Sequence, residues 1–204
     1  MGVTFQELLE NGGFAAWPKQ EKKYEPGGFG TPTGRVELCS EILRKLGYDP
    51  LPGFREPQES LYSRPDLARK YPLILITGGR HYPFYYSEHR QVPSLRRLHR
   101  DPITQLHPDT ASELGIADRD WIWIESPRGR VKQRCRLFDG IDPRVVHAQH
   151  GWWYPEMPGE EPWLHGVWES NINVVVDDEP DHCNAISGGW PLRAGLCRVY
   201  KVAD

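Results

Sequence analysis

A Thr-Gly-Gly-Arg sequence carries the first candidate binding chemistry of the chain. Thr77, Gly78, Gly79 and Arg80 directly follow the apolar run at residues 73–76. Two glycines let the backbone approach a ligand closely, and arginine donates through a planar fork that matches a phosphate. On these residues alone an ordinary turn with a surface arginine is the better interpretation, because glycines after a strand are common. The segment is therefore an anion-site candidate that needs support from elsewhere.

The next segment, residues 81–90, is a loop dense in aromatic rings and polar tips. We take His81, Ser87, His89 and Arg90 as its candidate ligand contacts, because binding residues concentrate on loops next to strands. Tyr82, Phe84 and Tyr85 of this loop are interpreted as packing residues.

Two later segments offer a close approach and hydrogen-bonding edges. Gly151 and Trp152 belong to a His-Gly-Trp-Trp sequence, in which the glycine permits close contact and one tryptophan can stack on a flat ring. Adjacent tryptophans point apart, so at least one is expected in the core. Asn171 and Asn173 are two residues apart and each carries a donor and an acceptor. Asn171 also fits a plain turn.

The histidines and cysteines do not predict a metal centre. His107, His147 and His182 match no zinc spacing, so structural or surface roles are favoured. The four cysteines include no C-x-x-C pair, which argues against structural zinc and against an iron–sulfur cluster. Free, mostly buried thiols are the expected state.

Charge and hydropathy give no support for nucleic acid or a membrane as a partner. The 204 residues include 25 basic and 28 acidic side chains, for a net charge of −3. The local basic cluster Arg96, Arg97, His99 and Arg100 is interpreted as a solvated helix face. No apolar run approaches the roughly 20 residues of a membrane-spanning helix. No targeting signal is predicted at the N-terminus, and the compartment stays open.

Short strands must position these segments. The apolar run at 73–76 is expected to be buried on both faces, and Trp121–Ile124 alternates with the period of two typical of a strand. Pro108 suits the first position of a short helix that ends at Gly115. The expected strands are 35–38, 73–76, 104–107, 121–124, 131–137, 144–149, 173–176 and 195–202, and the expected helices are 5–10, 41–46, 64–70, 94–100 and 108–114. Many short strands, few helices and long loops favour a small barrel over a doubly wound sheet.

Seven motifs in a fixed order carry a family resemblance. They are FGTPTGRVEL from Phe29, TGGR from Thr77, HPDTASELGIADRD from His107, SPRG from Ser126, HGWW from His150, NIN from Asn171 and ISG from Ile186. This set resembles the C-terminal portion of the molybdopterin oxidoreductases, the family of dimethyl-sulfoxide reductase and formate dehydrogenase. Arg119 stands where glycine is usual in that family. We expect the change to be harmless, because the backbone freedom of glycine is one of several ways to form the turn.

The resemblance implies a mainly β fold, a double-psi β-barrel of the aspartate-decarboxylase-like type over residues 71–204. Residues 1–70 would form an extended arm and linker with short helices, lying against larger catalytic domains. The implied cofactor is molybdopterin guanine dinucleotide, with molybdenum or tungsten carried by the parent enzyme and no protein metal ligand or catalytic residue in this chain. The implied cofactor-binding residues are Thr77, Gly78, Gly79, Arg80, His81, Ser87, Arg90, Gly151, Trp152, Asn171 and Asn173.

The implied function is the C-terminal cofactor-binding domain of a molybdenum or tungsten oxidoreductase, inactive by itself. Its partners would be the remaining catalytic domains, and the resemblance also allows an iron–sulfur electron-transfer subunit. The alternative is a stand-alone binding or assembly module with a β-barrel and no redox role. An upstream segment of several hundred residues with a cysteine cluster would distinguish the two.

Overall fold

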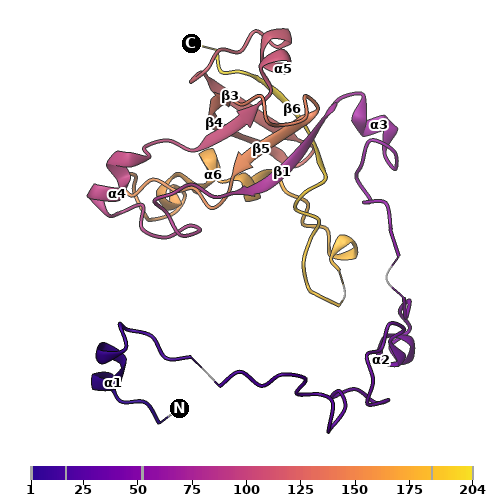
Figure 1. Cartoon of the computed structure of the whole chain (residues 1–204). Helices are drawn as coiled ribbons and strands as arrows, with labels where there is room; N and C mark the ends of the chain where they lie inside the picture. Colours follow the sequence, from indigo (N-terminus) through magenta and orange to yellow (C-terminus); the bar gives the residue numbers. More distant parts are fainter. Residues whose placement is uncertain (1, 17, 52, 185, 204) are drawn as a thin grey trace. The chain divides into compact units, whose positions relative to one another are not determined.

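The computed structural model describes residues 2–16, 18–51, 53–184 and 186–203 (Figure 1). Contacts divide the chain into two compact units, Met1–Phe54 and Arg55–Asp204. The elements are α1 (Phe5–Glu10), α2 (Glu41–Lys45), α3 (Pro65–Ala68), β1 (Leu73–Gly79), α4 (Pro93–Leu98), β2 (Ile103–Leu106), α5 (Pro108–Glu113), β3 (Trp121–Ser126), β4 (Gly129–Leu137), β5 (Val145–Gln149), α6 (Val167–Ser170) and β6 (Gly195–Lys201), with 3-10 turns at Leu164–Gly166, Ile172–Val175 and Pro180–His182.

The first unit holds the two short helices α1 and α2, both predicted from their caps. Thr4 and Glu7 form a reciprocal capping box at the start of α1. Ser40 accepts a hydrogen bond from the third residue of α2. The strand expected at 35–38 is wrong: the Thr31 hydroxyl donates to the Arg35 carbonyl at 2.6 Å, and this local bond replaces a ladder bond.

The second unit is built on a closed barrel with strand order β1-β5-β2-β4-β3-β6. β1 runs parallel to β5 and β2 runs parallel to β4, while β2 is antiparallel to β5 and β6 is antiparallel to β1 and β3. Closure pairs the edge strands and leaves no open sheet edge. The prediction of a mainly β chain built on a small barrel, with few short helices, is confirmed.

The alternation of isoleucine and tryptophan along β3 determines which side chains point into the barrel. Ile122 and Ile124 have no exposed surface and pack in the main hydrophobic cluster. The intervening Trp121 and Trp123 lie half-buried on the outer face. There the guanidinium of Arg130 lies 4.3 Å from the Trp123 ring centre, so cations cover the outward aromatic rings.

The expectation that the first barrel strand is buried on both faces is wrong. In β1 only Leu75 and Gly79 are buried, whereas Ile74 and Ile76 are half-buried on the outer surface. A barrel strand has one face in the core and one face outside, so a continuous apolar run does not require two covered faces. The strand also continues through Gly78 and Gly79, three residues beyond the predicted end.

The strand expected at 173–176 is also wrong, because these residues lie in the 3-10 turn Ile172–Val175. The Asn171 side chain caps the turn by accepting from the Asn173 amide. With three residues per turn, Ile172 and Val175 share one face, and both pack into the main hydrophobic cluster of the barrel.

The strand directions place the loops at two ends of the barrel. β1 and β5 are parallel, so the segments that leave them, at Arg80 and His150, start from the same end. α5 leaves β2, which runs the opposite way, and Figure 1 shows α5 at the end away from α4 and α6. At the α4 end a second cluster packs Phe84, Trp152 and Tyr154. Among the described residues, no helix combines the length and the apolar character needed to span a bilayer.

Candidate functional site

The site begins where β1 ends. Gly78 has a φ of +93°, and a Cβ built there would meet nothing within 4 Å, so its backbone borders open space. Gly79 is closely packed within the protein, because a Cβ there would lie 3.1 Å from the Ala148 carbonyl oxygen. Thr77 is turned away from this space, since its hydroxyl donates to the Leu192 carbonyl at 3.1 Å.

Arg80 projects an exposed cation beside the glycines. Its guanidinium lies 4.2 Å from the ring centre of Tyr86 and also donates to the hydroxyl of that tyrosine. No carboxylate pairs with Arg80 in the part of the chain that the structure describes. The charge therefore remains available to an anion.

The loops after β1 and β5 are joined by direct contacts. A His150 ring nitrogen lies 3.3 Å from the Gly79 carbonyl, and the Trp153 indole donates to the Ser87 carbonyl at 2.6 Å. Gly151 has a φ of +62°, and its Cβ would lie 3.0 Å from the Ser87 Cβ. Glycine is therefore needed at position 151 so that the two loops can meet.

A third segment closes the arrangement. The Asn171 amide donates to the Trp152 carbonyl at 3.1 Å, and its oxygen accepts from the Asn173 amide. Asn173 itself is exposed. We call residues 77–90, 150–153 and 170–173 the three-loop face. The predicted convergence of residues 78–90, 150–153 and 170–173 is seen in these contacts, which join the first segment to the second and the second to the third.

Arg90 and Trp152 are fully buried behind this face. The Arg90 guanidinium lies over the rings of Phe84, at 5.0 Å, and Trp152, at 4.8 Å, which contact each other edge to face. It donates to the carbonyls of Tyr86, at 3.0 Å, and His150, at 3.4 Å. Burial, with a smaller contribution from Arg96, lowers the pKa of Arg90 to about 10. These two residues hold the loops together from inside.

Sequence reasoning missed Gln133, which ties β4 to β2, to the end of β5 and to the third segment. This fully buried side chain accepts from the Thr104 hydroxyl at 2.8 Å and donates to the carbonyls of Gln149 and Ser170, each at 3.0 Å. The available signal was a polar residue between Val131 and Cys135 on the inward face of β4. A satisfied amide at such a position fixes one arrangement of the backbone around it.

The histidines near the site are held neutral. Burial, and then the charges of His99, Arg136 and further histidines, lowers the pKa of His81 to about 4, and His81 stacks on His99 at 4.8 Å. Burial also lowers the pKa of His99, His147 and His150. Positive charge at the three-loop face is therefore supplied by Arg80, while the imidazoles act as neutral hydrogen-bonding and stacking groups.

The basic cluster of the 94–100 segment is not the simple solvated face that we predicted. Arg96 stacks on Trp152 at 5.1 Å and pairs with Glu156 at 2.8 Å. His99 lies 2.9 Å from the Gln149 amide oxygen. Only Arg97 and Arg100 of the cluster are exposed. The other two, Arg96 and His99, are less exposed because an aromatic residue distant in sequence, Trp152, packs against them.

One group of potential metal ligands lies elsewhere, at Glu59, Asp177 and His182, whose ligand atoms all lie within 4.8 Å of one another. Arg128 pairs with Glu59 at 2.8 Å and also with Asp177, so a guanidinium already supplies the positive charge there. The four cysteines are free as predicted, and burial raises the pKa of the Cys135 thiol to about 12.

The three-loop face suits a ligand that combines an anion with flat polar rings. Arg80 supplies charge, exposed Ser87 and Asn173 supply polar groups, and Gly78 supplies open backbone. The Nε2 of His150 and the Nε1 of Trp152 are buried without a hydrogen-bond partner. Because such groups are normally satisfied, the unpaired His150 nitrogen fits a partner from outside the chain.

Comparisons with known proteins agree with this geometry. A family model described as the molydopterin dinucleotide binding domain matches residues 73–188. Acetylene hydratase of Syntrophotalea acetylenica is 37% identical over 200 residues, which cover 91% of this chain and 27% of that protein. Trimethylamine-N-oxide reductase of Haemophilus influenzae is 33% identical, over 74% of this chain and 18% of that protein.

A solved structure, acetylene hydratase from Pelobacter acetylenicus, superposes with a TM-score of 0.81 at 37% identity. The match covers 87% of this chain and 25% of that one. Dopamine dehydroxylase of Eggerthella lenta is 34% identical over 87% of this chain and 17% of its own length. The chain thus spans about a quarter or less of the relatives it matches.

Proposed function

Because the chain belongs to the molybdopterin dinucleotide binding family of the dimethyl-sulfoxide-reductase-type enzymes, we propose that its three-loop face holds molybdopterin guanine dinucleotide. The observation that carries this proposal is the hydrogen-bonded convergence of three separate loops, of which the first presents an exposed Arg80 that pairs with no described carboxylate. A pterin dinucleotide carries two phosphates and two flat heterocycles. It therefore needs the cation, amides and open backbone that this face offers.

Within the site, the predicted residues divide into contacts and supports. Arg80, Ser87 and Asn173 are exposed and would contact the cofactor, and Gly78 would let a phosphate approach its backbone. The supports keep these groups in place because their own side chains or backbones bond within the protein: Thr77, Gly79, His81, Arg90, Gly151, Trp152 and Asn171.

The cofactor, when bound, supplies two-electron chemistry at its molybdenum or tungsten. The residues of this chain bind and orient it. Arg80 would neutralise phosphate charge, and the imidazole of His150, whose pKa burial lowers, contacts the Gly79 carbonyl behind it. None of the predicted site residues is assigned a proton-transfer or metal-ligating role.

We place this domain within a longer enzyme, because it spans only 17–27% of the curated relatives described above. The remaining catalytic domains of that enzyme would be its partners, with an iron–sulfur subunit as a further one. The chain by itself is then expected to show no redox activity. Dye turnover by the purified chain with formate or a sulfur oxyanion, free of host enzymes, would contradict this.

The direct test is a titration with guanosine diphosphate followed by backbone amide shifts. The expected shifts fall on residues 78–90, 150–153 and 170–173. Arg80→Ala should weaken binding about 10-fold to 100-fold, because a charge-assisted hydrogen bond contributes roughly 1.5 to 3 kcal/mol. Arg64→Ala is the matched control, since Arg64 pairs with Asp66 on an exposed helix start.

Silence at all three loops, or equal binding by the Arg80 variant, would overturn the assignment. That result would favour the alternative of a binding or assembly module without a redox role.

A further inference from the structure

A groove of about 560 Å³ lies on the side of the barrel, outside the three-loop face. Its walls come from the segment between α4 and β2, from the turn that precedes β3, and from β4. Its lining residues are Leu98, His99, Arg100, Asp101, Ile103, Asp118, Arg119, Arg134, Cys135 and Arg136. We infer that this groove is a second anion site, which binds a small molecule carrying a phosphate or pyrophosphate group.

The charge balance of the groove favours an anion. Four arginines and two aspartates line it, which leaves a net charge of +2 on a chain whose total is −3. Arg134 is neutralised locally, because it pairs with Asp101 at 3.1 Å. Arg100 and Arg136 form no ion pair or side-chain hydrogen bond with other residues that the structure describes. Two exposed guanidinium groups are therefore left without carboxylates.

Arg119 adds a third cation from a position that disfavours arginine. Its φ of +67° lies in the left-handed region, where a Cβ is strained. Glycine would adopt this conformation freely. Strain of this kind persists where the surroundings impose it and is concentrated at functional sites. Among the described residues, the carboxylate that pairs with the Arg119 guanidinium is that of Asp118, and the two groups are as far apart as 4.0 Å.

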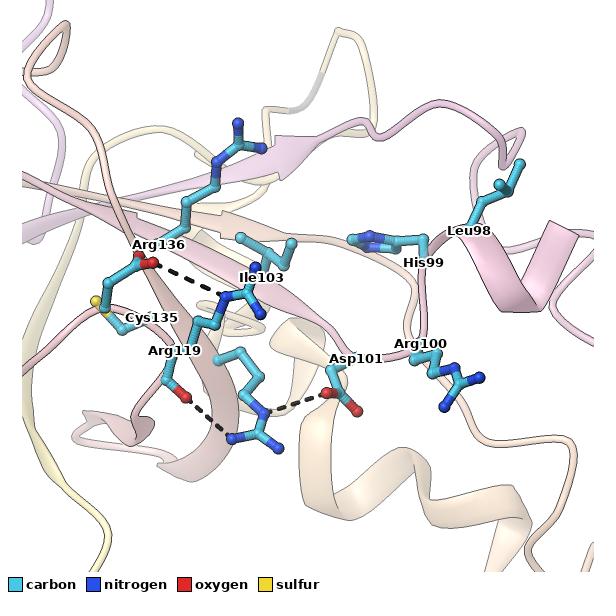
Figure 2. Close-up of a pocket in the computed structure, with 10 residues that line it drawn as sticks. Leu98, His99, Arg100, Asp101, Ile103, Arg119, Cys135 and Arg136 are labelled. Carbon is cyan, nitrogen blue, oxygen red and sulfur yellow. Dashed lines mark hydrogen bonds and ion pairs between the residues drawn. The ribbon is translucent and has the colours of Figure 1, made fainter.

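The turn that carries Arg119 is fixed to β4. The Arg119 amide donates to the Cys135 carbonyl at 2.9 Å, and the Arg119 carbonyl accepts from Arg134 at 2.9 Å. Asp118 accepts from the Leu137 amide at 3.0 Å. Figure 2 shows the Arg119 side chain directed toward Ile103, between Arg100 and Arg136 at opposite edges of the lining. The backbone below this side chain is therefore preorganised.

The volume and the apolar lining residues of the groove suit a small-molecule ligand. Its volume lies in the range of about 300 to 1,000 Å³ typical of small-molecule sites. Ile103 and Leu98 add apolar surface between the guanidinium groups, which suits an organic body attached to the anion. His99 forms the border with the three-loop face, because its ring stacks on His81.

Inorganic pyrophosphate is the probe for the test, titrated into the isotope-labelled full chain. The amides of residues 99–103, 118–120 and 134–136 should shift. Arg119→Gly should weaken this binding about 10-fold, as expected for the loss of one charged contact. This variant relieves the left-handed strain, so its fold should be retained. Arg119→Lys keeps the charge and should keep most of the affinity.

Two controls separate the groove from the three-loop face. Arg144→Gln removes an exposed arginine that pairs with Asp142 outside the groove, and it should leave pyrophosphate binding unchanged. Arg80→Ala should weaken guanosine diphosphate shifts at the three loops while the groove shifts persist. Absence of groove shifts, or unchanged affinity in Arg119→Gly, overturns the inference. Equal loss of groove binding in Arg80→Ala also overturns it, because the two places would then be one site for the cofactor's own pyrophosphate.

Discussion

The guanidinium of Arg90 lies 4.8 Å from the ring centre of Trp152, and neither side chain has any exposed surface. No carboxylate faces this buried cation within the described part of the chain. Instead, the guanidinium donates to the backbone carbonyls of Tyr86 and His150. It also lies against the rings of Phe84 and Trp152. The contact joins the loop after β1 to the loop after β5, so it sets the spacing of the candidate cofactor contacts.

Replacing Arg90 by lysine should therefore destabilise the chain although the charge is kept. A lysine ammonium cannot contact both rings with a planar face while it donates to two separate carbonyls, so the loss should be about 2 to 3 kcal/mol. Urea denaturation measures it. Arg97→Lys, on the exposed part of α4, is the control and should change stability by less than about 0.5 kcal/mol. Equal stability of the two variants would show that the contacts of the Arg90 guanidinium with the two rings and the two carbonyls contribute nothing specific.

Gln133→Leu should both destabilise the barrel and loosen the third loop. The change leaves the Thr104 hydroxyl and the carbonyls of Gln149 and Ser170 without their partner. Unsatisfied buried groups cost roughly 1 to 3 kcal/mol each, and partial relaxation should bring the sum to about 3 kcal/mol. Denaturation gives the stability, and hydrogen exchange at residues 170–173 reports the loosening.

Gln91→Leu is the matched control for that change, since Gln91 is exposed. If Gln133→Leu lowers stability but leaves exchange at residues 170–173 unaltered, the side chain supports the barrel only.

Stability should fall as the pH is lowered from about 6.5 toward 4. His81 has a folded-state pKa of about 4, below its ordinary value, so the unfolded chain takes up the proton first. The stabilisation from neutral His81 is complete above pH 6.5 and is lost as the pH falls through that window. Each unit of pKa shift corresponds to about 1.4 kcal/mol, reduced here because the ring is partly exposed.

His81→Phe keeps a ring against His99 but cannot titrate, so its stability should decline less between pH 6.5 and 4. Thermal unfolding across this range compares the two proteins. Parallel pH profiles would assign the decline to His99, His147 and His150, whose pKa values are lowered in the same direction.

The barrel could be predicted from the sequence because its signals are local. The alternation of Ile122 and Ile124 with tryptophans indicated a strand, and Pro108 with Gly115 marked the short α5. The same local rules failed at 173–176. The apolar residues of that segment suit a strand and a 3-10 turn equally well. The turn forms because it lets Ile172 and Val175 pack together into the barrel core.

The site was harder to predict, because its supports are defined by contacts between distant residues. Glycines and Arg80 are recognisable from spacing, whereas the position of Gln133 on the inward face of β4 indicates burial but does not identify its hydrogen-bond partners. The burial of Arg90 depends on Trp152, sixty-two residues later in the chain. Arg119 was expected to be harmless in its turn. That expectation stays a prediction. The structure shows only that Arg119 has the left-handed conformation that glycine favours, with its backbone hydrogen-bonded to β4.

The last prediction concerns the segment that precedes β1. Arg128, in the β3–β4 hairpin, pairs with Glu59 and Asp177, and these three side chains are only 17%, 14% and 7% exposed. Removing one partner of a buried pair leaves uncompensated charge, which costs up to about 3 to 5 kcal/mol when burial is complete. Glu59→Gln should therefore cost about 1 to 2 kcal/mol, since Asp177 still faces Arg128.

The same pair tests where the barrel domain begins. A chain starting at Arg55 keeps the contact between Glu59 and Arg128, whereas one starting at Tyr71, the predicted boundary, loses it together with buried Ser60. We expect the shorter chain to be less stable by about 2 kcal/mol in urea denaturation. The control is Glu56→Gln in the longer chain, because Glu56 is exposed. Equal stability of the two chains would place the boundary at residue 71 and make the segment from 55 to 70 a linker, because its contacts would then contribute no net free energy to the barrel.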